Sequence, residues 1–329
     1  LAARARHGLA APRRWRRLAA LGASAAAVGA CRQGGGWRAA AFIGFGAPLE
    51  LSAPREGLRA VVTGANKGIG LEIARLLARA GATVACGSRD LGRGRESCDS
   101  LQSEEGLPEG RVWPLQLDIA SADSIESARI ELETRFGAFD ILINNAGMAY
   151  KGSTFGAAEA QATIDCNTLG TMRATRAFLP LMRAAGPDGR VVNVASMAGR
   201  LRQVSPELQA RFADRSLSER GLEQLMEEFV GAVRDGRHKE QGWSNSMYGV
   251  SKLGVIAYTR LLARDLDPEA GPVVTCCCPG YCATDMSSWR GTKTALQGAD
   301  TPAWLALLDR REARARHGRM FQERRPFKW

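Results

Sequence analysis

A tyrosine and a lysine stand four residues apart, as Tyr248 and Lys252, in a stretch with helical periodicity. On a helix this spacing places both side chains on one face. An ammonium close to a phenol stabilises the phenolate and lowers the pKa of the phenol, which is what a general acid for a carbonyl oxygen needs. The pair alone is a common pattern, and a surface helix that carries an amphipathic tyrosine is the alternative interpretation.

A serine and an asparagine add to this pair. Ser196 follows the apolar segment 191–194, at the carboxyl end of a predicted strand, where open α/β sheets bind their ligands. Asn167 lies in the helical stretch that precedes this strand. Both residues favour a catalytic site over a surface helix.

A glycine-rich segment at 63–70, TGANKGIG, connects a short apolar strand to an amphipathic helix. Glycines in a strand–turn–helix unit let the backbone approach a pyrophosphate at the positive end of the helix. The segment therefore predicts a dinucleotide site.

The end of the second predicted strand indicates which dinucleotide binds. A chain that prefers NAD usually presents an acidic residue there, whereas this strand ends in Arg89. Arg89, helped by Lys67 in the glycine segment, could neutralise a 2′-phosphate, and we therefore favour NADP(H). Asp90 is the counter-argument, because a shift by one residue would make it a ribose ligand.

Short β-branched runs alternate with helical periodicity from residue 58 onward. This alternation predicts a Rossmann-type, doubly wound parallel α/β sheet in a single domain over residues 58–329. The expected strands are Arg59–Thr63, Thr83–Gly87, Arg111–Leu117, Ile141–Asn144, Arg190–Ala195 and Val273–Cys277. The expected helices lie near 69–80, 92–104, 122–136, 158–184 and 247–266.

Five motifs stand in the order that is typical of one family. They are TGxxxGxG at 63–70, NNAG at 144–147, the serine at 196, YxxxK at 248–252, and PG at 279–280 with Thr284 downstream. On these motifs residues 58–329 resemble the short-chain dehydrogenase/reductases. The long interval of 52 positions between Ser196 and Tyr248, together with CCPG at 277–280, is similar to the monomeric NADPH-dependent carbonyl reductases within that family.

The resemblance implies reduction of ketones, aldehydes or quinones to alcohols, with NADPH or NADP+ as the cofactor. Tyr248 would protonate the alkoxide, Ser196 would hydrogen-bond the same oxygen, and Lys252 would bind the nicotinamide ribose. Asn167 would hold a water that joins Lys252 to solvent. The implied catalytic residues are Asn167, Ser196, Tyr248 and Lys252.

The resemblance also implies two sets of binding residues. Asp118 would border the adenine and Thr284 the carboxamide. The implied cofactor-binding residues are Gly64, Asn66, Lys67, Gly68, Ile69, Gly70, Arg89, Asp118, Ile119, Asn145, Ala146, Gly147, Tyr248, Lys252, Pro279, Gly280 and Thr284. The implied substrate-binding residues are Ser196, Met197, Ala198, Tyr248 and Tyr281.

The inserted segment, about 200–243, contains one apolar stripe at helical spacing that closes before Gly236. The stripe consists of Leu222, Leu225, Met226, Phe229, Val230 and Val233. Such a helix must bury its stripe on a neighbour. In the resembling reductases the insertion covers a face that other members use for assembly, so the resemblance implies a monomer.

The substrate is the least defined part of the prediction. Met197, Ala198, Tyr281 and Trp243 would give a mainly apolar wall suited to aromatic ketones, aldehydes or quinones, although each could equally be ordinary core. Cys278 could modulate activity through its thiol or simply fill a buried strand end. A pathway-specific ketone reductase and a non-catalytic NADPH-binding regulator remain alternatives.

Charge and cysteine usage exclude several other classes. Eight arginines and no acidic residue lie in residues 1–49, so eight of the eleven net positive charges belong to an Arg-, Ala- and Gly-rich leader, predicted as residues 1–57. This composition is typical of a transit peptide, with a plastid favoured over a mitochondrion, or reflects an untranslated upstream stretch. No nucleic-acid partner, stable membrane insertion or metal is expected, because reading motifs, a long apolar run and Cys/His clusters are missing from the sequence.

Overall fold

The structure is a computed structural model that describes residues 56–185 and 188–329. Residues 1–55, which hold nearly all of the predicted leader, lie outside the described residues. Targeting to an organelle therefore stays a prediction.

The described residues form one eight-stranded sheet with the strand order β3-β2-β1-β4-β5-β6-β7-β8. All neighbours run parallel except β7 and β8, which pair antiparallel. The strands are β1 (Arg59–Val62), β2 (Thr83–Ser88), β3 (Val112–Gln116), β4 (Ile141–Asn144), β5 (Arg190–Val194), β6 (Val273–Cys278), β7 (Met320–Gln322) and β8 (Arg325–Phe327). The predicted Rossmann-type sheet and its six strands are confirmed, whereas β7 and β8 were not predicted.

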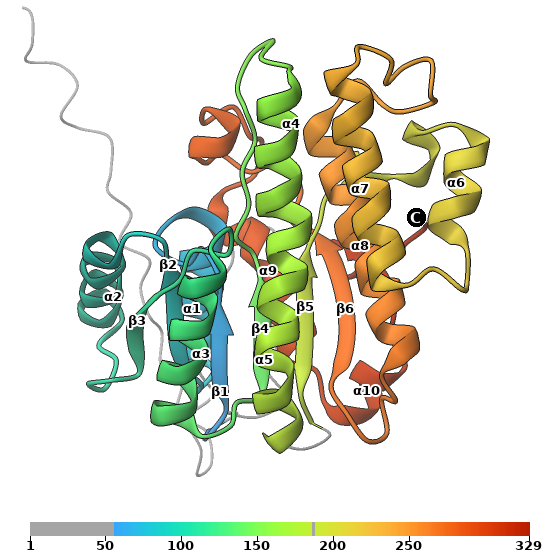
Figure 1. Cartoon of the computed structure of the whole chain (residues 1–329). Helices are drawn as coiled ribbons and strands as arrows, with labels where there is room; N and C mark the ends of the chain where they lie inside the picture. The colour runs from blue at the N-terminus through green and yellow to red at the C-terminus, as the bar shows by residue number, and fades with distance from the viewer. Residues whose placement is uncertain (1–55, 186–187) are drawn as a thin grey trace, which may run out of the picture. The chain divides into compact units, whose positions relative to one another are not determined.

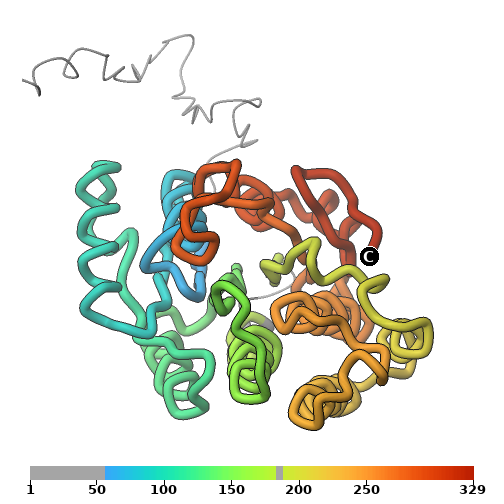
Figure 2. The backbone as a smooth tube through the Cα atoms, turned by 90° about the horizontal axis from the view of Figure 1, so that it is seen from above, coloured from blue at the N-terminus to red at the C-terminus, as the bar shows by residue number. Residues whose placement is uncertain are grey.

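Helices cover both faces of the sheet, as Figure 2 shows from above. Helices α1 (Gly68–Arg79), α2 (Leu91–Glu105) and α9 (Ala295–Leu307) pack their apolar residues into one buried cluster. Helices α3 (Ala122–Phe136), α5 (Thr171–Ala185) and α8 (Met247–Asp265) pack into the other. Among the described helices, none is long and apolar enough to cross a membrane.

The predicted helix near 158–184 is interrupted. It consists of α4 (Ala157–Ile164), a π-helical turn at Asp165–Gly170, and α5. A π-helical turn inserts an extra residue per turn and is found most often at functional sites. Here it contains Asn167, which is fully buried.

The insertion folds as α6 (Pro206–Ala213) and α7 (Glu219–Arg234), as Figure 1 shows. The apolar stripe of α7 is buried, as predicted, and the helix packs on α4 and α8. Trp243 is only 5% exposed and lies against the rings of Phe212 and Phe229. The suggestion that Trp243 lines the substrate site is therefore wrong, because the ring belongs to the core of the insertion.

The arginine-rich stretch 310–325 is folded and largely paired. It contains α10 (Arg310–Arg314) and β7. Arg314 forms an ion pair with Glu269 (2.6 Å), and Arg324 forms one with Asp300 (2.5 Å). Part of the local positive charge is therefore compensated within the fold.

Candidate active site

The four predicted catalytic side chains converge at the carboxyl end of β5. Ser196 comes two residues after this strand, and Tyr248 lies in the first turn of α8. The hydroxyl of Ser196 lies close enough to that of Tyr248 to act on its pKa, and the ammonium of Lys252 lies 5.9 Å from the centre of the Tyr248 ring. Asn167 contacts α8 through Ser251, the neighbour of Lys252.

Lys252 is almost completely buried, with 4% of its surface exposed. Its Nζ donates a hydrogen bond to the backbone carbonyl of Val194 (2.8 Å), which ends β5. Burial disfavours the charged ammonium and lowers the pKa of Lys252 to about 8. Small changes near this group therefore decide whether it carries a charge at physiological pH.

Tyr248 behaves differently from the sequence prediction. Burial raises the pKa of its phenol to about 12, although the nearby Ser196 hydroxyl acts in the opposite direction. The predicted lowering of this pKa is therefore wrong, because desolvation of the buried phenol dominates the shift. A protonated phenol is nevertheless the form that a proton donor requires.

Asn167 links two segments that the sequence keeps apart. Its Oδ1 accepts a hydrogen bond from the backbone nitrogen of Met148 (2.7 Å), and its Nδ2 donates to the Met148 carbonyl (2.8 Å) and to Ser251 Oγ (2.9 Å). A side chain added at Gly147 would lie 3.2 Å from Asn167 Oδ1 and 3.5 Å from Lys252 Nζ. Asn167 thus positions the loop after β4 against α8, and its role in holding a water stays a prediction.

The glycine segment has the geometry of an anion site. Gly64 and Gly68 have φ of +63° and +57°, and the N-terminus of α1 at Lys67 lacks a side-chain cap. The first turn of α1 contains no acidic residue, so its backbone N–H groups and positive helix end suit a pyrophosphate. These features fit the predicted dinucleotide.

Residues of the NNAG motif hold the glycine segment in place through hydrogen bonds. Asn145 Nδ2 donates to the backbone carbonyls of Thr63 (3.0 Å) and Gly64 (3.1 Å). Thr63 Oγ1 in turn accepts from the backbone nitrogens of Asn145 and Ala146. The side chain of Asn145, predicted to line the cofactor, is therefore engaged in holding the glycine turn.

The charged side chains near the expected site of the cofactor's 2′-phosphate have separate roles. Arg89 is exposed directly after β2. Asp90 caps α2 by accepting from the Arg93 backbone nitrogen (3.1 Å), which weighs against the alternative of Asp90 as a ribose ligand. Lys67 forms an ion pair with Asp285 (2.6 Å), a partner that the sequence did not indicate.

Other predicted cofactor residues differ in how well they fit. Thr284 borders the glycine turn, since a side chain at Gly68 would lie 3.4 Å from its Cγ2. Asp118 accepts from the backbone nitrogen of Ala120 (3.0 Å) and thereby shapes its own turn. The side chain of Ile119 is only 4% exposed and belongs to the core, so its predicted contact is limited to the backbone.

The remaining predicted residues lie around these turns. Ile69 packs against the core on the α1 side, and Asn66 accepts at its carbonyl from Ser97 (2.7 Å). Gly280, after Pro279, has a φ of +88°, a conformation that glycine adopts without strain.

The predicted substrate side is open and partly apolar. Tyr281 is 54% exposed and Ala198 is exposed, whereas Met197 is partly buried. Met286 and Trp289 are also exposed and were missed, because a loop without periodicity gives no signal of burial or exposure. Cys278 is 4% exposed, which supports its role as a filler of a strand end.

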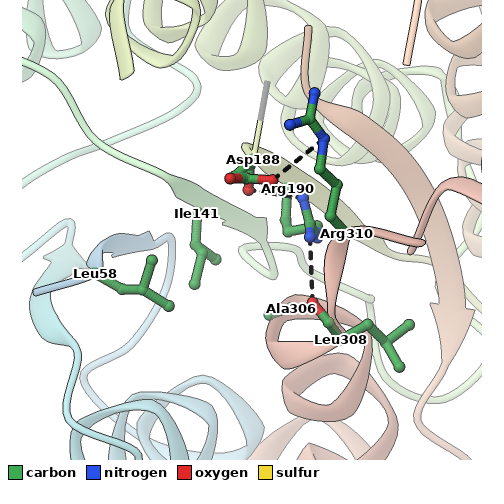
Figure 3. Close-up of a pocket in the computed structure, with 7 residues that line it drawn as sticks. All are labelled: Leu58, Ile141, Asp188, Arg190, Ala306, Leu308 and Arg310. Carbon is green, nitrogen blue, oxygen red and sulfur yellow. Dashed lines mark hydrogen bonds and ion pairs between the residues drawn. The ribbon is translucent and has the colours of Figure 1, made fainter. Parts of the chain in front are cut away.

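A cavity of about 200 Å³ lies at the amino ends of the central strands, opposite the catalytic side chains. Figure 3 shows Asp188 paired with Arg310 (3.6 Å) and Arg190 bonded to the carbonyl of Leu308 (3.2 Å). Arg190 starts β5, whereas Ser196 follows its far end, so the length of a strand separates this cavity from the catalytic side chains.

Sequence comparisons agree with this geometry. A family model described as short chain dehydrogenase matches residues 59–207. The NADPH carbonyl reductase 1 of Mus musculus is 39% identical over 278 residues, which cover 82% of this chain and 98% of that protein. The chain belongs to the short-chain dehydrogenase family.

Solved structures of two plant reductases resemble this short-chain dehydrogenase. Salutaridine reductase from Papaver somniferum is 27% identical with a TM-score of 0.71, and the match covers 77% of this chain and 96% of that chain. Menthone neomenthol reductase from Mentha piperita is 30% identical with a TM-score of 0.68, over 80% and 98% of the two chains. The matches therefore cover a larger part of the chain than the family model does.

Replacing Tyr248 by phenylalanine should abolish turnover without loss of cofactor binding. The variant keeps the ring but lacks the proton, so we expect kcat to fall by about 100-fold or more while the Kd of the nicotinamide cofactor is unchanged. Steady-state kinetics and fluorescence titration measure the two quantities. Tyr258→Phe, on the same helix, is the control and should keep its turnover. Near-normal turnover in Tyr248→Phe would rule out this residue as the acid.

The lowered pKa of Lys252 predicts a loss of activity at alkaline pH. The ammonium is charged below pH about 8 and then stabilises the tyrosinate that forms when Tyr248 gives up its proton; above that pH the charge is lost. We therefore expect kcat/KM for a carbonyl substrate, at saturating cofactor, to decline above pH about 8, or somewhat higher because the bound anionic cofactor favours the ammonium. The Lys252→Met variant should have a low kcat/KM that does not decline further above this pH. A flat wild-type profile from about pH 7 to 10 would contradict the assignment.

Proposed function

We propose that this short-chain dehydrogenase is an NADPH-dependent carbonyl reductase that converts ketones, aldehydes or quinones to alcohols. The observation that carries the proposal is the convergence of Ser196 and Tyr248 beside the buried Lys252, at the sheet edge that also holds the glycine turn. The 39% identity to NADPH carbonyl reductase 1 of Mus musculus supports the same activity.

The chemistry divides between the cofactor and these side chains. Bound NADPH supplies the hydride that reduces the carbonyl carbon. Ser196 donates a hydrogen bond to the carbonyl oxygen and stabilises the negative charge that develops there. Tyr248 Oη then gives its proton to that oxygen, and the positive charge of Lys252 stabilises the tyrosinate left behind.

The preference for NADPH rests on cations near the end of β2. Arg89 is exposed at this position, and Lys67 lies at the N-terminus of α1. Lys67 is paired with Asp285, and both side chains are more than half exposed. Exposed pairs of this kind are weak, so a doubly charged 2′-phosphate would compete well for Lys67.

A pathway-specific ketone reductase is the second candidate. The loop after β6 exposes three large apolar or aromatic side chains, Tyr281, Met286 and Trp289. At a substrate entrance they would favour an apolar ketone. The two plant reductases that resemble this fold are named for particular compounds, which supports a specialist. A non-catalytic regulator has less support, because Ser196, Tyr248 and Lys252 are all present and in contact.

The function is tested by an absorbance assay of a chain that starts near Ser52. We expect oxidation of NADPH, and much less of NADH, with a quinone and an aromatic aldehyde. A specialist would instead favour one terpene-like or steroid-like ketone by orders of magnitude in kcat/KM. Tight NADPH binding without turnover of any carbonyl compound would favour the regulator.

Replacing Arg89 by serine should weaken NADPH selectively. Loss of a charge-assisted phosphate contact is expected to raise the KM for NADPH by about 10-fold to 100-fold, with little change for NADH. Arg93→Ser is the matched control, because this exposed arginine is paired with Asp90 one turn along α2. Equal effects on both cofactors would refute the assignment of Arg89.

The protein is proposed to be a monomer. Helix α7 buries its apolar stripe on α4 and α8 and so covers that face of the domain. Light scattering at micromolar concentration should give the mass of one chain. A species of dimer size would contradict the proposal.

A further inference from the structure

The indole of Trp329 reaches the turn that follows the catalytic serine. Its Nε1 donates a hydrogen bond to the carbonyl of Gly199 (3.2 Å). The guanidinium of Arg260, from α8, lies 4.8 Å from the centre of the indole. The ring also packs on a buried cluster that contains Ala195, the residue before Ser196.

The turn after Ser196 is also restricted on the side that faces α8. Residues Met197–Gly199 form a 3-10 turn, and Ser196 Oγ accepts from the backbone nitrogen of Ala198 (3.1 Å). A side chain at Gly199 would lie 2.6 Å from the backbone carbon of Lys252. The turn is therefore held between the backbone of α8 and the indole of Trp329.

A second contact joins the same two segments. The guanidinium of Arg200 lies 4.9 Å from the ring centre of Phe327 in β8 and donates to Met197 Sδ (3.3 Å). The segment 325–329 thus contacts the turn at two separate points. The catalytic mechanism uses none of these contacts directly.

We propose that Trp329 is a positioning residue, which fixes the Met197–Gly199 turn so that the Ser196 hydroxyl faces Tyr248. Without the indole N–H, the carbonyl of Gly199 loses its partner and the turn can rotate. Ser196 then meets the carbonyl oxygen of the substrate less often in the productive geometry. The inference rests on the proposed function for its kinetic consequence, but not for its structural one.

The kinetic test compares Trp329→Phe with Trp304→Phe. Both tryptophans lie beside an arginine, and Trp304 packs edge-on against Phe321 of β7, away from the catalytic turn. Trp329→Phe should lower kcat by about fivefold or more and leave the Kd of NADPH unchanged, whereas Trp304→Phe should change neither.

A double-mutant cycle separates positioning from general damage. In a Ser196→Ala background the Trp329→Phe substitution should lower kcat no further, because the serine hydroxyl that Trp329 positions is already absent. A loss of kcat that is the same in both backgrounds would overturn the proposal, as would an unchanged kcat in the single variant.

Hydrogen exchange tests the structural part without any turnover. Backbone amides of residues 197–200 should exchange faster in Trp329→Phe than in wild type or Trp304→Phe. Unchanged exchange would overturn the positioning role even if the enzyme is active. Faster exchange in a protein that reduces no carbonyl compound would uphold the contact and refute the proposed function alone.

Discussion

The hydrogen bond from the buried ammonium of Lys252 to the carbonyl of Val194 joins the helix that carries the proton donor to the strand that leads to Ser196. Burying a charge is unfavourable unless neighbouring dipoles compensate for it, and the lowered pKa of Lys252 reflects how incomplete that compensation is. The close approach of this helix also requires a glycine. A side chain at Gly199 would collide with the backbone of the same lysine, 2.6 Å from its carbonyl carbon.

Much of the surrounding polar network holds the backbone in place. Asn145 and Thr63 tie the glycine turn to the end of β4, and Asn167 ties the following loop to α8. These side chains are satisfied within the protein, as buried polar groups must be. Motif residues of this kind act on the cofactor indirectly, by keeping the glycine turn and the catalytic helix at a fixed separation.

Electrostatic roles depend on which partners the fold brings close. Lys67 is separated from Asp285 by most of the chain, yet the two side chains form an ion pair. This pairing has no sequence pattern, because it depends on a tertiary contact between the turn after β1 and the loop after β6. Asp90 has the right chemistry for a ribose ligand but begins α2 as its cap, through a local contact with the backbone of Arg93.

The sequence by itself determined the Rossmann-type sheet and six of its strands, and it predicted the four catalytic positions, because apolar periodicity and closely spaced motifs are local signals. It also predicted the stripe of α7. Only the tertiary structure decided that Trp243 lies in the core of the insertion, that the long helix near Asn167 contains a π-helical turn, and that Tyr248 has a raised pKa. These properties depend on desolvation and on contacts between distant segments. The short strands β7 and β8 escaped prediction for the same reason: three residues carry no periodicity, and each strand is defined by its pairing, β7 with β6 and β8 with β7.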